Sequence, residues 1–434
     1  MIRISGEHSR EMAQQFLPEV LLQNPRHVYF SKIVHPIDRT ILDEGCVIFF
    51  EAPHSYTGED VVEFHLHGNP FILKSVLAVL VELGVRLATS GEFTKRAFLH
   101  GKMDLTKAES VYDILHANTP MTQSIALGHL AGKLWTYLSG LRHEIMVLLE
   151  HMQGSIDFPD EIDPIPRLDF ISRVKQLEHD LEHLIALQDY GKSVFSGVRC
   201  VILGKPNVGK SSLLNQLAGH PRAIVSRIAG TTRDFIEVKI ELGGIQFEFV
   251  DTAGLRHSQD EIEKKGIRQV SSLVRRADAI FWVVDQSRPF DEDDDKIMRS
   301  IPAKKPLYMV LNKSDKKTRW VCPHLNRKKL TKVLSLCAKT GVGMDGLKQG
   351  LCEDFLEKIA KNSLDLMCNA RQLGVLKKTR DVLSQVLKTA QLGFEDALLV
   401  MDLEGAIRSL GELTGADITE EMLDGIFSKF CVGK

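Results

Sequence analysis

The spacing of apolar residues changes several times along the 434-residue chain, and each change predicts a different kind of structure. Apolar runs over residues 2–5, 46–50 and 61–66, with a helical pattern over residues 72–83, predict a mixed α/β region. From about residue 102 to 191 apolar residues recur at helical spacing, as in Ile145, Leu148, Leu149 and Met152. Residues 157–160 interrupt this spacing and predict a break between two helices.

The pattern changes again in the second half of the chain. Strand and helix patterns alternate between residues 194 and about 358, and helical spacing returns from 359 to the end. Because 434 residues exceed one ordinary core, we predict several domains. These are an α/β domain at residues 1–100, a helical domain formed by residues 101–193 and 359–434, and an α/β domain inserted at residues 194–358.

Composition narrows the class of protein. Hydrophobic residues make up 44% and charged residues 26%, which is typical of a soluble globular protein. Because the net charge is only −2, any contact with nucleic acid must use a local basic patch. No apolar run is long enough to span a membrane, and residues 1–5 do not resemble a signal peptide. The seven scattered cysteines form no CxxC pair, which favours a cytoplasmic protein without a disulfide frame or structural zinc.

The sequence GKPNVGKS at residues 204–211 fits the phosphate-binding-loop pattern G-x-x-x-x-G-K-[ST]. It follows a predicted buried strand at residues 198–203 and precedes a predicted helix at residues 212–217. Backbone N–H groups would bind a polyphosphate, Lys210 would reach its β- and γ-phosphates, and Ser211 would bind Mg²⁺. A glycine turn beside a solvated lysine is the simpler alternative, but this order of strand, loop and helix argues against it.

Two further motifs follow predicted strands at residues 247–250 and 307–311, and another strand is predicted at 279–284. Asp251 begins DTAG (residues 251–254), in which a carboxylate can hold Mg²⁺ through water and a glycine N–H can contact a γ-phosphate. Asp315 ends NKSD (residues 312–315) and can accept hydrogen bonds from N1–H and N2–H of guanine. Adenine lacks that pair of donors, so the three motifs together predict a GTPase.

Leu255 occupies the position at which Ras-like GTPases carry a glutamine that orients water. An apolar side chain cannot orient water, so another group of this chain or of a partner must do so. Carboxylates follow shortly afterwards, in DEIE at residues 260–263.

With these residues considered together, the whole chain resembles the MnmE/TrmE family of tRNA-modification GTPases. In the centre the resemblance rests on PNVGKSSLLN (206–215), AGTTRD (229–234) and DTAGLR (251–256), which related GTPases share. The discriminating sequences are SYTGED (55–60), GEFTKRAF (91–98) and the C-terminal FCVGK (430–434).

The resemblance implies an N-terminal α/β folate-binding-like domain, a discontinuous all-helical domain and an inserted Ras-like P-loop GTPase domain. It implies a cytoplasmic homodimer that forms a heterotetramer with the FAD-dependent flavoprotein MnmG/GidA and acts on tRNA. Together they would add a carboxymethylaminomethyl or aminomethyl group to C5 of the wobble uridine. The one-carbon unit would come from 5-formyl- or methylene-tetrahydrofolate, and GTP hydrolysis would use Mg²⁺ and K⁺, with K⁺ replacing an arginine finger.

The resemblance also implies roles for individual residues. The catalytic residues would be Glu263, which would position water in place of the missing glutamine, Lys210 and Cys431. Mg²⁺ would be bound by Ser211 and Thr232, and K⁺ by Asn207, Ser226, Ile228 and Thr231. Folate would be bound by Arg3, Glu63, Lys102 and Lys434. The GTP contacts would be Asn207, Val208, Gly209, Lys210, Ser211, Ser212, Ser226, Arg227, Ile228, Ala229, Gly230, Thr231, Thr232, Asp251, Thr252, Ala253, Gly254, Asn312, Lys313, Asp315, Cys337, Ala338 and Lys339.

The chain departs from the family pattern at two places. Family members usually begin with a further strand and a Gly/Pro-rich loop before the segment that matches residues 2–6. We therefore expect either an upstream start codon or a folate domain without that edge strand. The guanine-ring loop usually reads Ser-Ala-Lys or Ser-Ala-Arg, whereas here it is Cys337-Ala338-Lys339. Because backbone and the Ala-Lys pair supply most ring contacts, we expect little change.

Several residues keep simpler interpretations. His65 and His67 alternate on a predicted strand and are more often a polar strand face than a metal site. Cys431 is as readily a packing residue as a reactive thiol. Glu63 and Lys102 could be a surface pair, and the acidic run at residues 291–295 is most simply a solvated loop or a helix start.

Two other functions would share part of this sequence. A GTP-switched ribosome-assembly factor would carry the same central motifs, but it would also carry a basic RNA-binding domain, and the flanking regions show no such basic run. A folate-dependent aminomethyltransferase acting on protein would not need an inserted GTPase.

Overall fold

The computed structural model describes residues 1–219, 223–227, 236–251, 272–302, 305–321, 330–356 and 361–433. The chain forms two compact units, each described by itself. The first unit contains Met1–Leu115, Leu127–Glu178 and Val375–Lys434. The second unit contains His116–Ala126 and His179–Gly374. The predicted domain bounds near residues 100, 193 and 358 remain a prediction.

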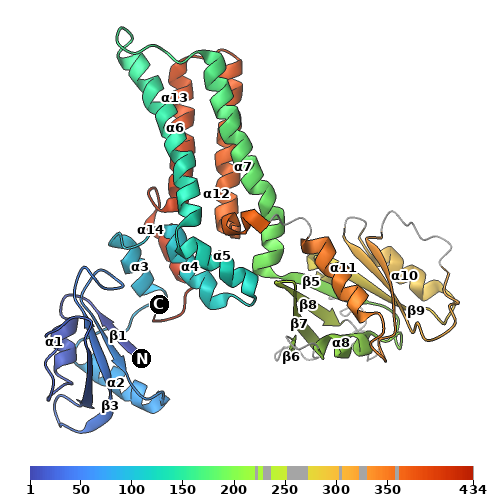
Figure 1. The fold of residues 1–434 in the computed structure, drawn as a ribbon, viewed down its shortest axis with the longest axis horizontal. Coiled ribbons are helices and arrows are strands. Elements are labelled where there is room, and N and C mark those ends of the chain that lie inside the picture. The colour runs from blue at the N-terminus through green and yellow to red at the C-terminus, as the bar shows by residue number, and fades with distance from the viewer. Residues whose placement is uncertain are drawn as a thin grey trace. The chain divides into compact units, whose positions relative to one another are not determined.

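The first unit begins with a four-stranded antiparallel sheet in the order β1-β4-β3-β2 (Figure 1). Its strands are β1 (Ile2–Ser5), β2 (Val28–Val34), β3 (Ile41–Phe50) and β4 (Val61–His65). Helices α1 (Ser9–Gln14) and α2 (Pro70–Glu82) pack on one face, where Phe49 and Phe64 are buried against Phe16 and Val76. The predicted strands and helix are confirmed. Strand β2 was not predicted, because Ser31 and Lys32 dilute its apolar pattern.

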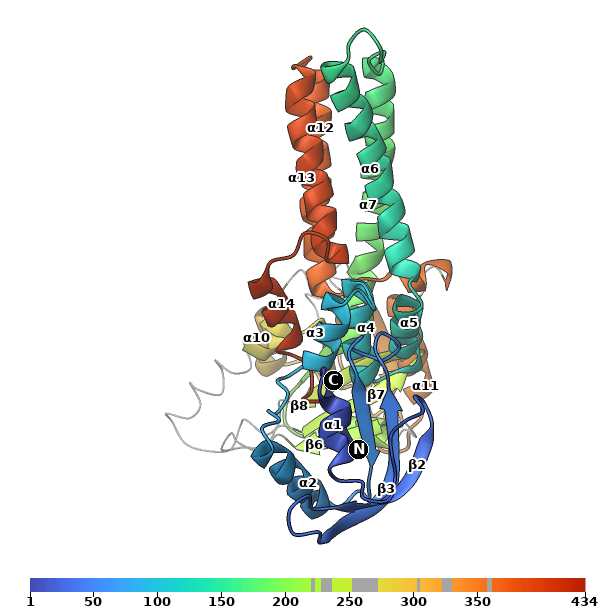
Figure 2. The same cartoon turned by 90° about the vertical axis from the view of Figure 1, so that its left-hand side faces the viewer.

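The rest of the first unit is helical. Its complete helices are α3 (Glu92–Leu99), α6 (Lys133–Asp157), α13 (Asp396–Thr414) and α14 (Glu420–Phe427). Four helices belong to it in part: α4 (Leu105–His116) up to Leu115, α5 (Pro120–Leu130) from Leu127, α7 (Arg167–Ser196) up to Glu178 and α12 (Ala370–Gln391) from Val375. The long helices α6, α12, α13 and the first part of α7 lie side by side (Figure 1 and Figure 2). Ile145, Leu148 and Met152 form part of the buried stripe of α6. The predicted break is confirmed, since α6 ends at Asp157.

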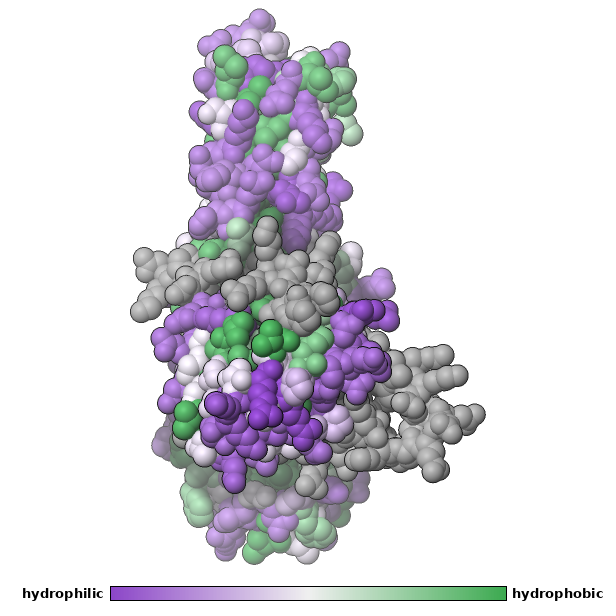
Figure 3. Space-filling view, turned by 90° about the vertical axis from the view of Figure 1, so that its right-hand side faces the viewer, coloured by the Kyte–Doolittle hydropathy of each residue, from purple (hydrophilic) through white to green (hydrophobic). Residues whose placement is uncertain are grey.

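No helix in the described ranges is long and apolar enough to cross a lipid bilayer. The long-helix bundle, at the top of Figure 3, shows mainly hydrophilic side chains on the visible face, with scattered apolar ones.

The second unit contains a seven-stranded sheet in the order β11-β10-β9-β5-β8-β7-β6. Its strands are β5 (Val198–Leu203), β6 (Ala223–Arg227), β7 (Ile236–Leu242), β8 (Ile245–Asp251), β9 (Ala279–Asp285), β10 (Leu307–Asn312) and β11 (Lys332–Leu336). Five neighbouring strands, β11, β10, β9, β5 and β8, are parallel to one another. Strand β7 is antiparallel to both of its neighbours, β8 and β6. Each strand predicted here from an apolar run is confirmed.

Helices cover both faces of this sheet. They include α8 (Lys210–Ala218), α10 (Glu292–Ser300) and α11 (Met344–Leu356), and a 3₁₀ turn follows at Lys361–Leu366. On β5, Cys200 and Ile202 pack in the core that contains α8 and α11, while Val201 packs in the core that contains α10. Because β5, β8 and β10 are parallel, their carboxyl ends meet at one edge. The phosphate-binding loop, Asp251 and the NKSD sequence therefore converge there, as the predicted P-loop fold requires.

Candidate functional site

Glycines shape the phosphate-binding loop between β5 and α8. Gly204 has φ +155°, and a Cβ on it would lie 2.4 Å from the carbonyl oxygen of Val283. Gly209 has φ +102°, and a Cβ there would lie 2.1 Å from Nδ2 of Asn312. A larger residue at either position would push the loop away from β9 or β10, so the tight turn before the helix N-terminus depends on these glycines.

Lys210 folds back over the loop. Its Nζ donates hydrogen bonds to the carbonyl oxygens of Gly204 at 2.9 Å and Lys205 at 2.7 Å, and its side chain is buried. The next residue, Ser211, places its Oγ 3.4 Å from Oδ2 of Asp251. A hydroxyl and a carboxylate side by side are oxygen donors of the kind that Mg²⁺ prefers, so these residues fit that ion.

Asn312 joins the two ends of the site. Its Nδ2 donates to the carbonyl oxygen of Val208 at 2.7 Å, and its Oδ1 accepts from the N–H of Ala338 at 2.9 Å. The side chain is 2% exposed, so these hydrogen bonds are shielded from water. Asn312 thereby fixes the phosphate-binding loop relative to the loop that begins at Cys337.

Lys313 reinforces this connection from the neighbouring position. Its Nζ donates to the carbonyl oxygen of Asn207 at 3.1 Å and to Oδ2 of Asp285 at 2.6 Å. Burial raises the pKa of Asp285, but hydrogen bonds from Lys313 and Ser287 outweigh it, and the carboxyl pKa lies below its ordinary value. Asn207 itself has φ +62°, a left-handed conformation that asparagine tolerates better than most side chains.

Asp315 and Cys337 lie together at the other end of the site. The Cys337 thiol donates to Oδ1 of Asp315 with a separation of 3.2 Å between sulfur and oxygen. Family members usually carry serine at the position of Cys337. The cysteine still donates a hydrogen bond there, although a thiol is a weaker donor than a hydroxyl.

A cavity of about 760 Å³ connects these groups. The predicted residues that line it are Asn207, Gly209, Lys210, Ser211, Ser212, Asn312, Lys313, Asp315, Cys337 and Lys339. Val208 and Ala338 contribute the backbone groups that bond to Asn312, and Asp251 lies beside Ser211. The structure thus brings the phosphate and guanine motifs to one cavity.

Other predicted residues cannot be placed. Those outside the described residues are Ile228, Ala229, Gly230, Thr231, Thr232, Thr252, Ala253, Gly254, Glu263 and Lys434. Ser226 and Arg227 lie on β6, of which the backbone is described. Their roles remain predictions.

The sequence interpretation missed a set of contacts around the phosphate-binding loop. Lys205 Nζ donates to Asp291 at 2.7 Å and to Asp294 at 2.9 Å, and Trp320 Nε1 lies 3.3 Å from the same Asp294 oxygen. Asp291 caps α10 in a reciprocal capping box with Asp294. The acidic run is therefore a helix start, as one interpretation held, but Asp294 is only 1% exposed rather than solvated. Nothing in the sequence indicated that Lys205 pairs with the acidic run, because 86 or more positions separate them. Lys316 also lines the cavity and was not predicted.

The predicted folate residues lie in the first unit. Arg3 and Glu63 face each other across β1 and β4, with Nε and Oε1 2.8 Å apart. The Arg3 guanidinium also lies 5.3 Å from the ring centre of Tyr56 and 5.4 Å from that of Phe93. Glu63 thus pairs with Arg3 rather than with Lys102, whose Nζ donates to the carbonyl oxygen of Pro53 at 2.7 Å.

Arg3 lines a second cavity of about 620 Å³. Apolar side chains of α2, including Leu77 and Leu80, form one part of its wall, and Val432 and Gly433 of the C-terminal segment form another. Glu63 and Lys102 are not among the residues that line it. The structure therefore unites Arg3 with the C-terminal segment and leaves the other two predicted contacts outside this cavity.

His65 and His67 contact different carboxylates. His65 Nε2 is 3.3 Å from Glu63, and His67 Nδ1 is 2.8 Å from Asp43. Among the described residues, no cluster of three or more His, Cys, Asp or Glu side chains is arranged to hold a metal. Cys431 is exposed, and its carbonyl oxygen accepts a hydrogen bond from the N–H of Gly91 at 3.4 Å.

Comparison with known proteins covers nearly the whole chain. The family described as "GTP-binding protein TrmE N-terminus" matches residues 1–102, and the family described as "MnmE helical domain" matches residues 105–431. The chain is 37% identical over 439 residues to "tRNA modification GTPase MnmE" of Aquifex aeolicus (strain VF5), covering 100% of this chain and 96% of that protein. It is 36% identical over 438 residues to the protein of the same name from Trichormus variabilis, covering 100% and 94%.

Similarity to solved structures is weaker. The G domain of the T. maritima FeoB iron transporter is 26% identical, covers 36% of this chain and 97% of that chain, and gives a TM-score of 0.29, too low to support an inference.

Proposed function

Because this chain belongs to the MnmE family of tRNA modification GTPases, we propose that it couples K⁺-activated GTP hydrolysis to modification of the tRNA wobble uridine. In this proposal a homodimer acts with the FAD-dependent flavoprotein MnmG/GidA in the cytoplasm. The two proteins add a carboxymethylaminomethyl or aminomethyl group at C5, and the one-carbon unit comes from 5-formyl- or methylene-tetrahydrofolate.

The position of Asn312 is the main support for the nucleotide-binding part of this proposal. Its two hydrogen bonds fix the phosphate-binding loop and the guanine-side loop around one cavity. GTP entering this cavity would meet Lys210 and Ser211 at its phosphates and Asp315 at its base. A carboxylate opposite the base can accept both N1–H and N2–H of guanine, which favours GTP over ATP.

Each residue around the phosphates has a distinct task. Lys210 would exchange its hydrogen bonds to Gly204 and Lys205 for the β- and γ-phosphate oxygens. The N-terminus of α8 would add N–H donors and a favourable dipole. Ser211, with Asp251 nearby and with Thr232, would hold Mg²⁺, which neutralises charge on the phosphates when bound.

The attacking water requires a residue other than Leu255. Glu263 is our candidate, because it follows the DTAG motif and a carboxylate can orient water. The Asn207 side chain, with backbone of Ser226, Ile228 and Thr231, would hold K⁺. A positive charge there stabilises the charge that develops on the transferred phosphoryl group.

Folate is assigned to the first unit. Arg3 lines a largely apolar cavity that would accept a pterin ring, and Lys434 follows Gly433 of its wall. Glu63 holds Arg3 in place, and Lys102 would turn from the Pro53 carbonyl toward a folate carboxylate. Cys431 precedes two residues that line this cavity, and in this proposal its exposed thiol takes a chemical role in the modification.

The K⁺ requirement tests the nucleotide proposal. GTP turnover by the full-length protein should be about tenfold or more faster in KCl than in NaCl at equal ionic strength, because the bound cation stabilises the transition state. Asn207→Ala should remove this difference. Asn215→Ala, an exposed asparagine on α8, is the matched control and should retain it. Equal wild-type rates in the two salts would reject K⁺ activation.

A further inference from the structure

Two of the sequences that distinguish this chain from other GTPases meet in the first unit. SYTGED (residues 55–60) lies between β3 and β4, and GEFTKRAF (residues 91–98) contains most of α3. The hydroxyls of Tyr56 and Thr94 are 2.9 Å apart and join the two sequences directly. Neither sequence has a role in the chemistry proposed above.

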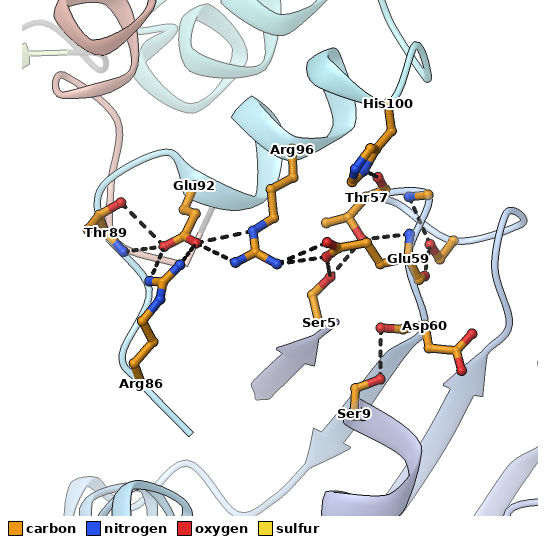
Figure 4. A network of polar contacts seen from close by, with 12 residues as sticks. Ser5, Ser9, Thr57, Glu59, Asp60, Arg86, Thr89, Glu92, Arg96 and His100 are labelled. Carbon is orange, nitrogen blue, oxygen red and sulfur yellow. Dashed lines mark hydrogen bonds and ion pairs between the residues drawn. The ribbon is translucent and has the colours of Figure 1, made fainter. Parts of the chain in front are cut away.

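Arg96 of α3 lies between two carboxylates (Figure 4). Its NH1 donates to both oxygens of Glu59, at 3.1 and 2.8 Å. Its Nε and NH2 donate to Oε1 of Glu92, at 3.1 and 2.7 Å. Glu59 also accepts a hydrogen bond from Ser5 of β1 at 2.7 Å, so one guanidinium connects α3 with the loop and the edge strand.

The two carboxylates are held in their charged forms. Hydrogen bonds from Arg86, then the Thr89 backbone and Arg96, keep the pKa of Glu92 far below its ordinary value despite burial. Burial opposes ionisation of Glu59, but hydrogen bonds from Ser5 and Arg96 outweigh it and lower the pKa of that carboxyl. The contacts around Arg96 are therefore charge-assisted and stronger than neutral hydrogen bonds.

The start of α3 also holds the C-terminal segment. Gly91 donates its N–H to the carbonyl oxygen of Cys431 at 3.4 Å, and Ser90 pairs with Val432 in an antiparallel bridge. Gly91 has φ +68°, and a Cβ there would lie 2.7 Å from the carbonyl oxygen of Phe427. The close approach of the two backbones therefore depends on a glycine at this position.

These contacts surround the cavity that contains Arg3. Ser5, Glu92 and Arg96 line it together with Val432 and Gly433. Arg96 bonds to Glu59 of the 55–60 loop, and Glu59 in turn bonds to Ser5 of β1. The start of the same helix contacts the C-terminal segment through Gly91. Displacement of α3 would therefore change the position of both walls.

We propose that Arg96 is a positioning residue: it holds α3 against β1 and the 55–60 loop, and α3 in turn holds the Cys431-Val432-Gly433 segment at the folate cavity. The proposal rests on the folate function assigned above. Arg96→Gln removes the charge and the ability to bridge both carboxylates. Arg96→Lys keeps the charge, but a single ammonium cannot reproduce the contacts that three guanidinium nitrogens make with the two carboxylates.

Hydrogen–deuterium exchange and folate titration of the full-length protein test it. In Arg96→Gln, amide exchange at Gly91 and in the peptide containing residues 430–433 should accelerate roughly tenfold, because the hydrogen bonds between them open more often. The dissociation constant for 5-formyl-tetrahydrofolate should rise roughly tenfold, and Arg96→Lys should be intermediate. GTP turnover should stay within about twofold, since these contacts lie outside the nucleotide cavity.

Arg380→Gln is the matched control, because Arg380 is an arginine of α12 that bonds to the adjacent Asp381. It should leave exchange and folate affinity unchanged. If Arg96→Gln alters neither exchange at Gly91 nor folate affinity, the proposal is wrong. Weaker folate binding with unchanged exchange would mean that Arg96 contacts the ligand directly, which also overturns a positioning role. If the wild-type protein does not bind the folate, the folate function fails, and the exchange rates alone still decide whether Arg96 positions the segment.

Discussion

At the scale of single residues, Asp315 has its Oδ1 in contact with the Cys337 thiol while it faces the cavity proposed for guanine. The thiol donor fixes one oxygen of the carboxylate, so the side chain is oriented before nucleotide arrives. Specificity for guanine then depends on Asp315 being an acceptor on both oxygens. An amide at this position would offer a donor where guanine also offers one.

Asp315→Asn should therefore weaken GTP binding and favour xanthosine triphosphate, whose base carries an acceptor at the mismatched position. A mismatched buried polar pair costs about 1–3 kcal/mol, or roughly fivefold to 150-fold in the dissociation constant. Fluorescence titration with GTP and with xanthosine triphosphate measures the two dissociation constants and shows which nucleotide the variant prefers. GTP affinity that does not change in the variant would reject the assigned role.

Asp113 gives the first unit a predicted pH dependence. It lies on α4, where burial and then the nearby Glu109 charge raise the pKa of its carboxyl to about 7. An unfolded aspartate has a pKa of about 3.9, so between these values the folded state binds the extra proton and stability falls as pH rises. Asp113→Asn cannot ionise and should remove this loss.

Urea denaturation at pH 5 and pH 8 tests this prediction. The free energy of unfolding of Asp113→Asn should exceed that of wild type by about 1–2 kcal/mol at pH 8, a value discounted for partial solvent exposure. The difference should be smaller at pH 5, because only the first part of the interval between the unfolded and folded pKa values has been crossed at that pH. Equal stabilities at pH 8 would show that Asp113 is not destabilised by its surroundings.

The sequence predicted the nucleotide residues more fully than the contacts between them. Spacing within a motif is local, so Lys210, Ser211 and Asp315 could be assigned from the order of strands and loops. Arg96 and Glu59 are separated by 37 positions and Lys205 and Asp294 by 89, so their pairing depends on how distant elements pack. Burial of Asp294 was missed for the same reason.

At the scale of elements, α10 links its own N-terminus to the phosphate-binding loop. Asp294 lies in the first turn, shares a capping box with Asp291 and accepts hydrogen bonds from Lys205 and Trp320. Removing its carboxylate leaves the buried indole N–H of Trp320 without this acceptor and the half-buried ammonium of Lys205 with Asp291 as its remaining carboxylate.

Asp294→Ala should lower the free energy of unfolding of the second unit by about 2–4 kcal/mol, the usual cost of orphaning buried polar groups. GTP affinity should fall as well, because Lys205 belongs to the phosphate-binding loop. Asp293→Ala is the control, since Asp293 is exposed and pairs with Lys296 on the surface, and it should change stability by less than about 0.5 kcal/mol. Equal free energies of unfolding for Asp294→Ala and Asp293→Ala, measured by chemical denaturation, would show that the contacts of Asp294 do not stabilise the second unit.

Elements were predictable where their apolar pattern was strong. The buried strands β5, β9 and β10 appear in the sequence as continuous apolar runs, and helix α6 as a regular stripe. Strand β2 has alternating exposed and buried residues at an edge of its sheet, and its pattern is too weak to distinguish from a loop. The order of strands in the sheet requires long-range pairing and was not predicted from local pattern.

At the scale of the whole molecule, the account assigns two chemistries to different units. The nucleotide cavity is built from residues of the second unit, and the Arg3 cavity from residues of the first. The chain passes between the units more than once, so motion of the GTPase part can act on more than one point of the helical part. This connection is our proposed route for coupling.

Single substitutions should separate the two chemistries. Glu263→Ala should abolish GTP hydrolysis and tRNA modification but leave folate affinity intact, because Glu263 is proposed to position water. Lys102→Ala should leave GTP turnover within about twofold of wild type and weaken folate binding roughly tenfold, through loss of a cation for a folate carboxylate. Loss of folate binding in Glu263→Ala, or of GTP turnover in Lys102→Ala, would contradict separate sites.

Cys431→Ser gives a related test of the C-terminal segment. If modification is lost while folate binding and GTP turnover persist, the thiol has a chemical role. If modification persists, the exposed Cys431 thiol has no chemical role, and the remaining functions of the segment lie in Val432 and Gly433 at the cavity wall.

Mass spectrometry of wobble uridines is the most direct test of the central claim that this chain serves tRNA modification. Total tRNA would be digested to nucleosides from cells that lack the protein and from the same cells carrying the wild-type chain. The account predicts loss of carboxymethylaminomethyl and aminomethyl groups at C5 in the first sample and their return in the second. An unchanged set of C5-modified uridines in cells without the protein would contradict it.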